Sequence, residues 1–232
     1  MIATSEWYPH LAYLSFPTIF VPLTDDEAEL LAGDGKGRTA RASAIAKLDR
    51  AIRAIPGACF VHADVCSPSD APEFQKTKGA VRNGEAAWKL LRASNKVKQA
   101  VGEMGIRRLG VRPYRRMDTV REFRLFVYDG KLSAISQMNL ERHFARLAGR
   151  RQEIAERAEE IAAAVAAFYP KSRLVIDAYL TSGGELLILD LNDWGETEPL
   201  LLLNWDRDWS QPVGLKLIEK PTKLGGDVEV SF

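Results

Sequence analysis

The spacing of apolar residues predicts helices in four stretches of the chain. Between residues 39 and 55, Ile45, Leu48 and Ile52 fall on one stripe, as in a helix that buries one face. A Pro-Gly pair at residues 56–57 follows directly and ends this helix. The same spacing, or Ala-rich amphipathic sequence, predicts further helices at residues 25–32, 85–93 and 150–168.

Short apolar runs between turn residues predict strands, and two pairs of such runs predict hairpins. Asp129-Gly130 separates the runs at residues 120–128 and 131–139, and Asp-Gly is a strong signal for a two-residue hairpin turn. A second hairpin joins residues 174–180 to 186–192. Single strands are predicted at residues 16–23, 59–63 and 109–114.

This mixed order of helices and strands predicts an α+β fold of two lobes, in which antiparallel sheets are flanked by helices. We place the boundary at the start of the short run that contains Pro113, because proline suits an edge strand or a connector. The N-terminal lobe would comprise residues 1–108, and the C-terminal lobe residues 109–232.

Composition excludes several classes of protein. The 232 residues include 32 Lys and Arg against 31 Asp and Glu, a net charge of +1, which offers no overall basic field to nucleic acid or an anionic membrane. No apolar stretch is long enough to cross a membrane, and residues 1–14 lack the pattern of a signal peptide. The spacing of Cys59 and Cys66 fits neither a zinc site nor a redox pair. We therefore expect a cytoplasmic protein with reduced thiols.

The second hairpin carries the most informative polar pattern. If residues 182–185 form the turn, Asp177 lies directly opposite Asp190, and Asn192 shares their face. Two facing carboxylates repel each other. A divalent cation would neutralise them, and a site of oxygen ligands alone suits Mg²⁺ better than zinc or copper. The opposite face is wholly apolar and is predicted to be core: Leu174, Ile176, Ala178, Leu180, Leu187, Leu189 and Leu191.

Two alternatives to a metal site fit the same pattern. The carboxylates would be solvated if this face of the sheet were exposed. Alternatively, a lysine or arginine from a neighbouring strand would form an ion pair with them.

The first hairpin offers a matching polar face. Its turn places Arg124 opposite Ile135 and Glu122 opposite Gln137, so that Glu122, Arg124, Gln137 and Asn139 share one side. An arginine beside a magnesium site would suit phosphate, because its planar fork matches phosphate oxygens. A pair between Arg124 and Glu122 along the strand is the alternative.

Four blocks of sequence resemble the cell-division-cycle protein 123 family, a divergent branch of the ATP-grasp superfamily. Ser67-Pro68-Ser69-Asp70-Ala71 is similar to its S-x-P-K-D-A segment. The remaining blocks are Trp7-Tyr8-Pro9 with Phe20–Leu23, Glu122–Val127 with Leu132–Gln137, and Ile176–Tyr179 with Ile188–Asn192. They resemble, in that order, the family's opening, its E-F-R-x-F-V and I-S-Q strands, and its D-V-Y and L-I-D-F-N-P strands.

The resemblance implies a two-lobed ATP-grasp fold with ATP between the lobes. Asp177, Asp190 and Asn192 would hold Mg²⁺ against the phosphates. Residues 109–114 would line the adenine pocket, and the loop at 76–82 would close over the nucleotide. The residues assigned to nucleotide binding on this basis are His62, Lys78, Arg82, Arg112 and Arg124.

This sequence also departs from the family pattern. His62 stands where the family has a basic residue, Ser69 replaces a Lys or Arg, and Met138 stands where an Arg is expected. Val65 and Asp193 replace a Trp and a Pro. The missing cations weaken the expected hold on the phosphates.

Two functions follow from the resemblance. The first is an ATP-grasp ligase that phosphorylates a carboxylate for attack by an amine, with Glu122 and Arg124 as catalytic residues bordering the acceptor pocket. The alternative is a nucleotide-gated binding protein or assembly chaperone without turnover, like the eukaryotic relatives that help to assemble translation initiation factor two. The partners would be ATP and a small-molecule or protein acceptor.

A nucleic-acid ligase or RNA-binding protein is a third, more remote alternative. It would need a basic groove with stacking aromatics. A basic run does occur, and a solvated or phosphate-facing wall accounts for it more simply: Lys96, Lys98, Arg107, Arg108, Arg112, Arg115 and Arg116.

Overall fold

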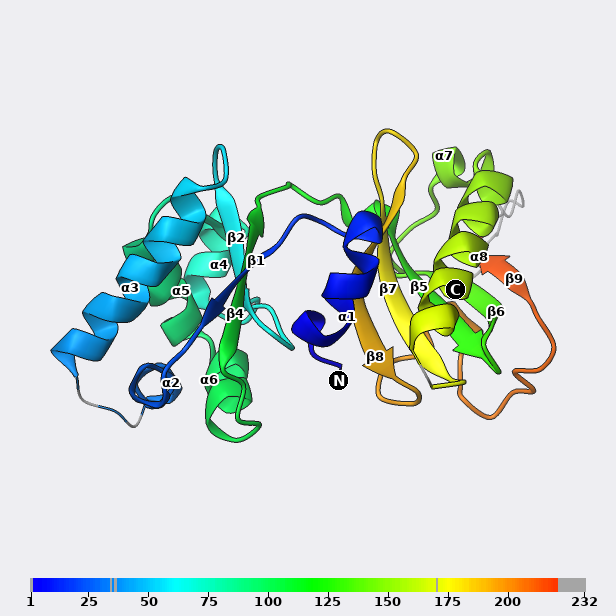
Figure 1. Ribbon diagram of the computed structural model, residues 1–232. Helices are drawn as coiled ribbons and strands as arrows, with labels where there is room; N and C mark the ends of the chain where they lie inside the picture. Colours follow the sequence, from blue (N-terminus) through cyan, green and yellow to red (C-terminus); the bar gives the residue numbers. More distant parts are fainter. Residues whose placement is uncertain (1, 34, 36, 170, 221–232) are drawn as a thin grey trace, which may run out of the picture.

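The computed structural model describes residues 2–33, 35, 37–169 and 171–220. Its strands form two separate sheets, which lie in two lobes side by side (Figure 1). The predicted α+β architecture is therefore confirmed. Within the described residues, no helix combines the length and the apolar character needed to cross a membrane.

The first lobe contains a four-stranded antiparallel sheet in the order β1-β4-β2-β3. Its strands are β1 (Ile19–Pro22), β2 (Cys59–Ala63), β3 (Ala80–Val81) and β4 (Arg108–Pro113). Its helices are α2 (Asp25–Ala32), α3 (Arg38–Arg53), α4 (Pro72–Thr77), α5 (Gly84–Ala93) and α6 (Asn95–Gly102). Leu48 and Ile52 of α3 are buried, as the apolar stripe predicts, in one core with Val61 and Val111 of the sheet.

The second lobe contains a five-stranded sheet in the order β8-β7-β5-β6-β9, antiparallel except for the pair β6 and β9. Its strands are β5 (Glu122–Tyr128), β6 (Lys131–Gln137), β7 (Leu174–Leu180), β8 (Leu186–Asp193) and β9 (Gly214–Lys216). The helices that follow its first strands are α7 (Ala145–Ala148) and α8 (Arg151–Phe168), and α1 (Thr4–Leu11) from the start of the chain joins them. The structure also has short 3₁₀ turns at η1 (Ala12–Leu14), η2 (Thr119–Arg121) and η3 (Leu200–Leu202). Ile154 and Ile161 of α8 pack against Phe123 and Ile176 of the sheet.

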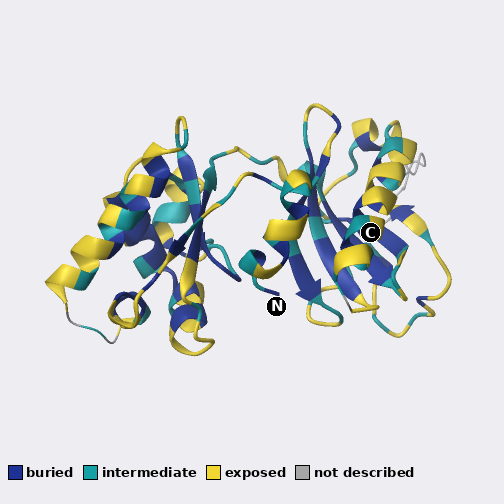
Figure 2. Ribbon diagram, viewed as in Figure 1, coloured by how far each residue is buried: buried dark blue, intermediate teal, exposed yellow. Residues whose placement is uncertain are grey.

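The opposite face of this second sheet is covered by the chain that follows β8. Trp194, Trp205 and Trp209 pack around Phe126 there, with ring centroids 5.0 to 6.5 Å from its ring. This small third core covers one end of the face, and the rest of the face turns toward the first lobe. Figure 2 shows that burial concentrates on the two sheets and on the inner sides of the helices.

The division between the lobes differs from the predicted boundary at residues 108 and 109. β4 pairs with β1 on one side and with β2 on the other, so it is a central strand of the first lobe and not an edge or a connector. Pro113 is tolerated because it is the last residue of that strand. The chain therefore leaves the first lobe after Pro113.

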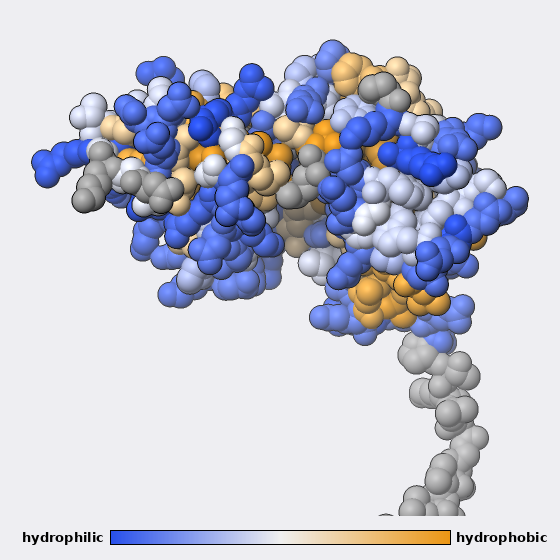
Figure 3. Space-filling view, turned by 90° about the horizontal axis from the view of Figure 1, so that it is seen from below, coloured by the Kyte–Doolittle hydropathy of each residue, from blue (hydrophilic) through white to orange (hydrophobic). Residues whose placement is uncertain are grey.

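The start of the chain also departs from the prediction, because it packs in the second lobe. Trp7 and Leu11 of α1 (Thr4–Leu11) are buried in the core of that lobe, and β1 then enters the first lobe. Thr4 N donates to the carbonyl of Asp64 at 2.9 Å, while Ser5 N and Oγ donate to the Asp64 carboxylate at 2.8 and 2.6 Å. α1 therefore contacts both lobes. In the view from below, a hollow lies between the two lobes at the bottom of the picture (Figure 3).

Candidate functional site

The carboxylate pair predicted on the second hairpin is present. Asp177 of β7 lies opposite Asp190 of β8. Asn192 is buried, and its Nδ2 lies 3.4 Å from Asp177 Oδ2. All three side chains therefore gather on the face of the sheet that turns away from α8.

A bulge in β8 changes the predicted apolar face. The pairing passes from Asp177–Asp190 to Ala178–Ile188, so Leu189 has no partner on β7. An extra residue reverses the alternation of side chains beyond it. As a result Ile188 is buried in the core, while Leu189 lines the cleft between the lobes. The prediction that Leu187 and Leu189 belong to the core was wrong.

Arg124 of β5 holds Asp177. It lies opposite Asp177 in the sheet, and its Nε and Nη2 donate to the two carboxylate oxygens at 2.7 and 2.9 Å. Its Nη1 donates to the carbonyl of Glu198 at 2.9 Å. One alternative for this hairpin, an ion pair with an arginine from a neighbouring strand, is therefore found at Asp177. Arg124 pairs with Asp177 and not with Glu122.

Asp190 is in a different electrostatic environment. Burial raises the pKa of its carboxyl to about 7, and the charge of Asp177 adds to the rise, while the Leu191 N–H and the charge of Arg112 oppose it. The Leu191 N–H donates to Asp190 Oδ1 at 2.9 Å. Among the described residues, no lysine, arginine or histidine forms an ion pair with Asp190. Once Asp190 is deprotonated, the pair therefore retains a negative charge that a bound cation would neutralise.

The carboxylate and amide oxygens at this site fit Mg²⁺ as a ligand set. Asp190 lines a cavity of about 170 Å³, and carboxylate and amide oxygens are ligands that Mg²⁺ accepts, together with water and phosphate oxygens. No group of three His, Cys, Asp or Glu in the described part of the chain is arranged to hold a metal. A metal here would therefore depend on Asn192 and on oxygens from a ligand.

A larger cavity of about 500 Å³ adjoins this site. It shares Phe60, Ser67, Arg112 and Leu189 with the smaller one, so both belong to one cleft between the sheets. Its volume is typical of small-molecule sites. The end of β4 and the segment after it line the cavity, together with side chains from both lobes: Phe16, Phe74, Lys78, Pro113, Tyr114, Arg115, Arg116, Met117, Thr119 and Glu122.

Arg112 lies where the two cavities meet. Its guanidinium carbon stands 4.7 Å from the ring centre of Phe60 and 5.7 Å from that of Phe16, distances at which an arginine is attracted to an aromatic face. Burial lowers the pKa of Arg112 to about 10, against the pull of Asp190. Arg112 thus remains a cation at neutral pH and supplies positive charge to the cleft.

His62 contributes no positive charge, although it stands where the family has a basic residue. Burial, together with the nearby charge of Arg112, lowers its pKa to about 3. Its Nδ1 lies 2.8 Å from the carbonyl of Ala63 and therefore carries the proton. Nε2 is left as an acceptor with no partner among the described residues. His62 lines the smaller cavity as a neutral group.

The remaining predicted residues are distributed unevenly. Lys78 and Glu122 line the larger cavity, and burial followed by repulsion from Asp177 and Asp118 raises the pKa of Glu122. Arg82 is exposed and lines neither cavity. The loop predicted at 76–82 contains the end of α4 and the strand β3, which pairs with β2.

Gln137 does not share the face of Arg124. The pairing of β5 with β6 shifts between Phe126 and Val127, so Arg124 faces Ser136 instead of Ile135. Gln137 is buried, and its Nε2 donates to the carbonyls of Asn139 and Arg142. The aromatic walls of the cleft were also missed, because Phe16, Phe60 and Phe74 come from separate elements and follow no common spacing.

The sequence profile of the D123 family matches residues 38–212. The chain belongs to the D123 family. A CDC123-like protein of Acanthamoeba polyphaga mimivirus is 25% identical over 241 residues, which covers 93% of this chain and 74% of the viral protein. The translation initiation factor eIF2 assembly protein of Xenopus tropicalis is 29% identical over 93 residues, or 38% of this chain and 28% of the frog protein.

Two solved structures of Cdc123 show the same fold. Cdc123 from Schizosaccharomyces pombe superposes with a TM-score of 0.75 at 19% identity, covering 88% of this chain and 87% of the yeast chain. A C-terminally truncated form gives 0.77 at 18% identity, covering 92% and 93%. The predicted resemblance is therefore confirmed, and the chain has the two-lobed α+β fold of these structures.

Proposed function

We propose that the protein binds magnesium-ATP in the cleft between its lobes and assists the assembly of a protein partner in a nucleotide-dependent manner. The observation that carries the proposal is the Asp177–Asp190 pair, in which Arg124 neutralises the first carboxylate and no contacting side chain among the described residues neutralises the second. A buried carboxylate in this state is costly unless a ligand completes the site.

Each side chain has a defined part in this binding. Asp190, which lines the smaller cavity, and the buried Asn192 on the same face of the sheet would contact Mg²⁺, and Arg124 fixes the orientation of Asp177 beside them. Bound Mg²⁺ would supply positive charge toward the phosphates. Arg112 faces the same region as a permanent cation, and the larger cavity of about 500 Å³ offers the aromatic walls of Phe60 and Phe74 to the base.

Two observations favour assembly over the carboxylate–amine ligase that the sequence also suggests. A relative carries the name of an eIF2 assembly protein. Phosphoryl transfer also needs preorganised charge at the developing transition state, whereas in this cleft Arg124 is engaged by Asp177 and His62 is neutral. These features support holding a nucleotide more than transferring its phosphate.

Thermal unfolding with and without magnesium-ATP tests the proposal. Ligand at about a hundred times its Kd should stabilise the protein by roughly 2.7 kcal/mol, and ATP without Mg²⁺ should do much less. ADP release should stay at background when carboxylate and amine substrates are added. Steady ADP release with such a pair of substrates would support the ligase function instead. If magnesium-ATP does not change the unfolding temperature, the proposed nucleotide binding is refuted.

A further inference from the structure

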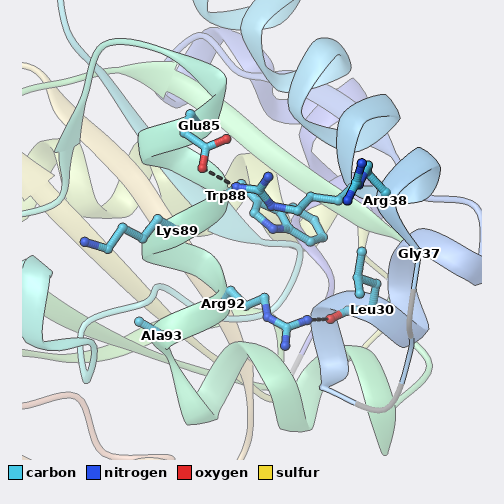
Figure 4. A pocket seen from close by; sticks show the side chains of 9 residues that line it. Leu30, Gly37, Arg38, Glu85, Trp88, Lys89, Arg92 and Ala93 are labelled. Atoms are coloured by element: carbon cyan, nitrogen blue, oxygen red, sulfur yellow. Dashed lines mark hydrogen bonds and ion pairs between the residues drawn. The ribbon is translucent and has the colours of Figure 1, made fainter.

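A second pocket lies in the first lobe, away from the cleft. It has a volume of about 750 Å³, and none of its residues lines the two cavities of the cleft. We call it the basic pocket (Figure 4), and it is lined by Leu30, Gly37, Arg38, Arg41, Glu85, Trp88, Lys89, Arg92 and Ala93.

The rim of the basic pocket is strongly positive. Four cations, two from α3 and two from α5, surround a single carboxylate, that of Glu85. The chain as a whole has a net charge of only +1, so this excess is local. Such a concentration of one sign steers oppositely charged partners toward a surface.

The existing contacts of these cations are weak or absent. Arg41 forms an ion pair with Glu85, and both side chains are at least half exposed; exposed pairs contribute little to stability. Lys89 lies 3.3 Å from Glu73. Arg38 forms no ion pair within the described part of the chain. An incoming carboxylate would therefore meet available donors and could replace Glu85 at Arg41.

The floor of the basic pocket is apolar. Trp88 and Leu30 are buried there, and the Arg92 guanidinium donates to the carbonyl of Leu30, which holds it at the edge of the floor (Figure 4). Because only 2% of Trp88 is exposed, it offers no face for stacking a nucleobase, which single-stranded nucleic acid would require. The arginine forks at the rim match the geometry of carboxylates.

We propose that the basic pocket docks an acidic segment of a protein partner, in which Asp or Glu side chains bind the arginines at its rim. This inference rests on the proposed function, since it supplies a docking site for the partner that an assembly protein requires. Arginine is enriched at such interfaces, and the pocket is separate from the nucleotide cleft.

Fluorescence polarisation with the full chain tests the docking site. The probe is a short fluorescein-labelled peptide of alternating Glu and Leu, and its control has Gln in place of Glu. Arg38→Glu should weaken binding of the acidic probe about fivefold or more, and Glu85→Gln, which removes the competing carboxylate, should tighten it by about twofold to fivefold. Arg50→Glu makes the same charge change at an exposed position of α3 outside the pocket and should leave binding unchanged.

Three results would overturn the inference: no binding of the acidic probe to the wild type, equal losses for Arg38→Glu and Arg50→Glu, or displacement of the probe by oligouridylate as effectively as by unlabelled peptide. The last would assign the pocket to nucleic acid. The thermal shift with magnesium-ATP should be unchanged in all three variants. A wild type that binds the probe but gains no stability from magnesium-ATP would refute the cleft and leave the docking site standing.

Discussion

Asp190→Asn should stabilise the ligand-free protein and abolish its response to magnesium-ATP. The variant removes one of two facing negative charges while keeping an oxygen that accepts the Leu191 N–H. Without ligand, the lost repulsion and the lower cost of burying a neutral amide both favour the folded state. With ligand, the same change removes a charged contact for Mg²⁺.

The magnitude follows from the pKa. The pKa of Asp190 rises from 3.8 to about 7. At about 1.36 kcal/mol for each pKa unit, this rise corresponds to a destabilisation by the charged carboxylate of at most about 4 kcal/mol. We expect Asp190→Asn to gain about 2 kcal/mol at pH 8, a rise in Tm of roughly 4–8 °C for a chain of this size. The wild type should gain roughly 2.7 kcal/mol from saturating magnesium-ATP, and the variant almost none.

The pH dependence has a definite sign. Because the folded protein binds the Asp190 proton more tightly than the unfolded chain does, the wild type loses stability as the pH rises from 3.8 through about 7. The advantage of Asp190→Asn should therefore be largest above pH 7 and disappear toward pH 4.

Scanning calorimetry across this range, with EDTA or with magnesium-ATP, measures both effects. Asp206→Asn, at an exposed aspartate outside the cleft, is the matched control and should change neither. A ligand-free Asp190→Asn with a Tm at or below that of the wild type at pH 8 would refute the electrostatic argument. A full magnesium-ATP shift in the variant would remove Asp190 from the site.

Three further variants test other parts of the structure. Arg124→Ala leaves the Asp177 carboxylate buried without its partner and should cost about 3–5 kcal/mol in urea unfolding, whereas an effect under about 1 kcal/mol would show that water replaces the arginine. In Gly110→Ala the new Cβ would overlap His62 Nε2, so the variant should lose about 1–3 kcal/mol of stability. Adding His62→Ala to the same chain should restore most of this stability, whereas additive losses would contradict the contact. Burial raises the pKa of Asp70, but hydrogen bonds from Ser94, Lys96 and Asn95 outweigh this effect and lower the pKa overall. Asp70→Asn should therefore cost about 1 kcal/mol of stability at pH 7, and less as the pH falls below 3.8. Acid titration of the wild type and the variant would reveal this trend.

The sequence predicts the elements well where local chemistry determines them. The helix at 150–168 and both hairpins appear because their apolar spacing and turn residues act over a few positions. The facing of Asp177 and Asp190 is correct because two shifts cancel: next to the turn the strands pair one residue away from the predicted register, with Leu180 opposite Leu186, and the bulge at Leu189 restores that register at Asp177.

Errors begin where one inserted residue or a distant contact intervenes. The bulge at Leu189 depends on the pairing of β8 with β7 and on contacts in the cleft. Because of this bulge, Leu187 and Leu189 lie outside the core in which they were predicted. The pairing of Arg124 with Asp177 joins residues 53 positions apart, so no local spacing could give it. The boundary between the lobes was misplaced because the role of β4 is fixed by pairing with β1 and β2, which lie far away in the chain.

The passage of the chain from α1 to β1, and its return after β4, gives the lobes two covalent connections instead of one. Two such tethers permit a rocking motion about the line that joins them, but they oppose twisting or sliding. Relative motion of the two lobes should therefore follow a single hinge axis. An expression fragment that begins at β1 would lose Trp7 from the opposite lobe and one of the two tethers, so the second lobe is best produced with residues 2–15 reattached through a linker.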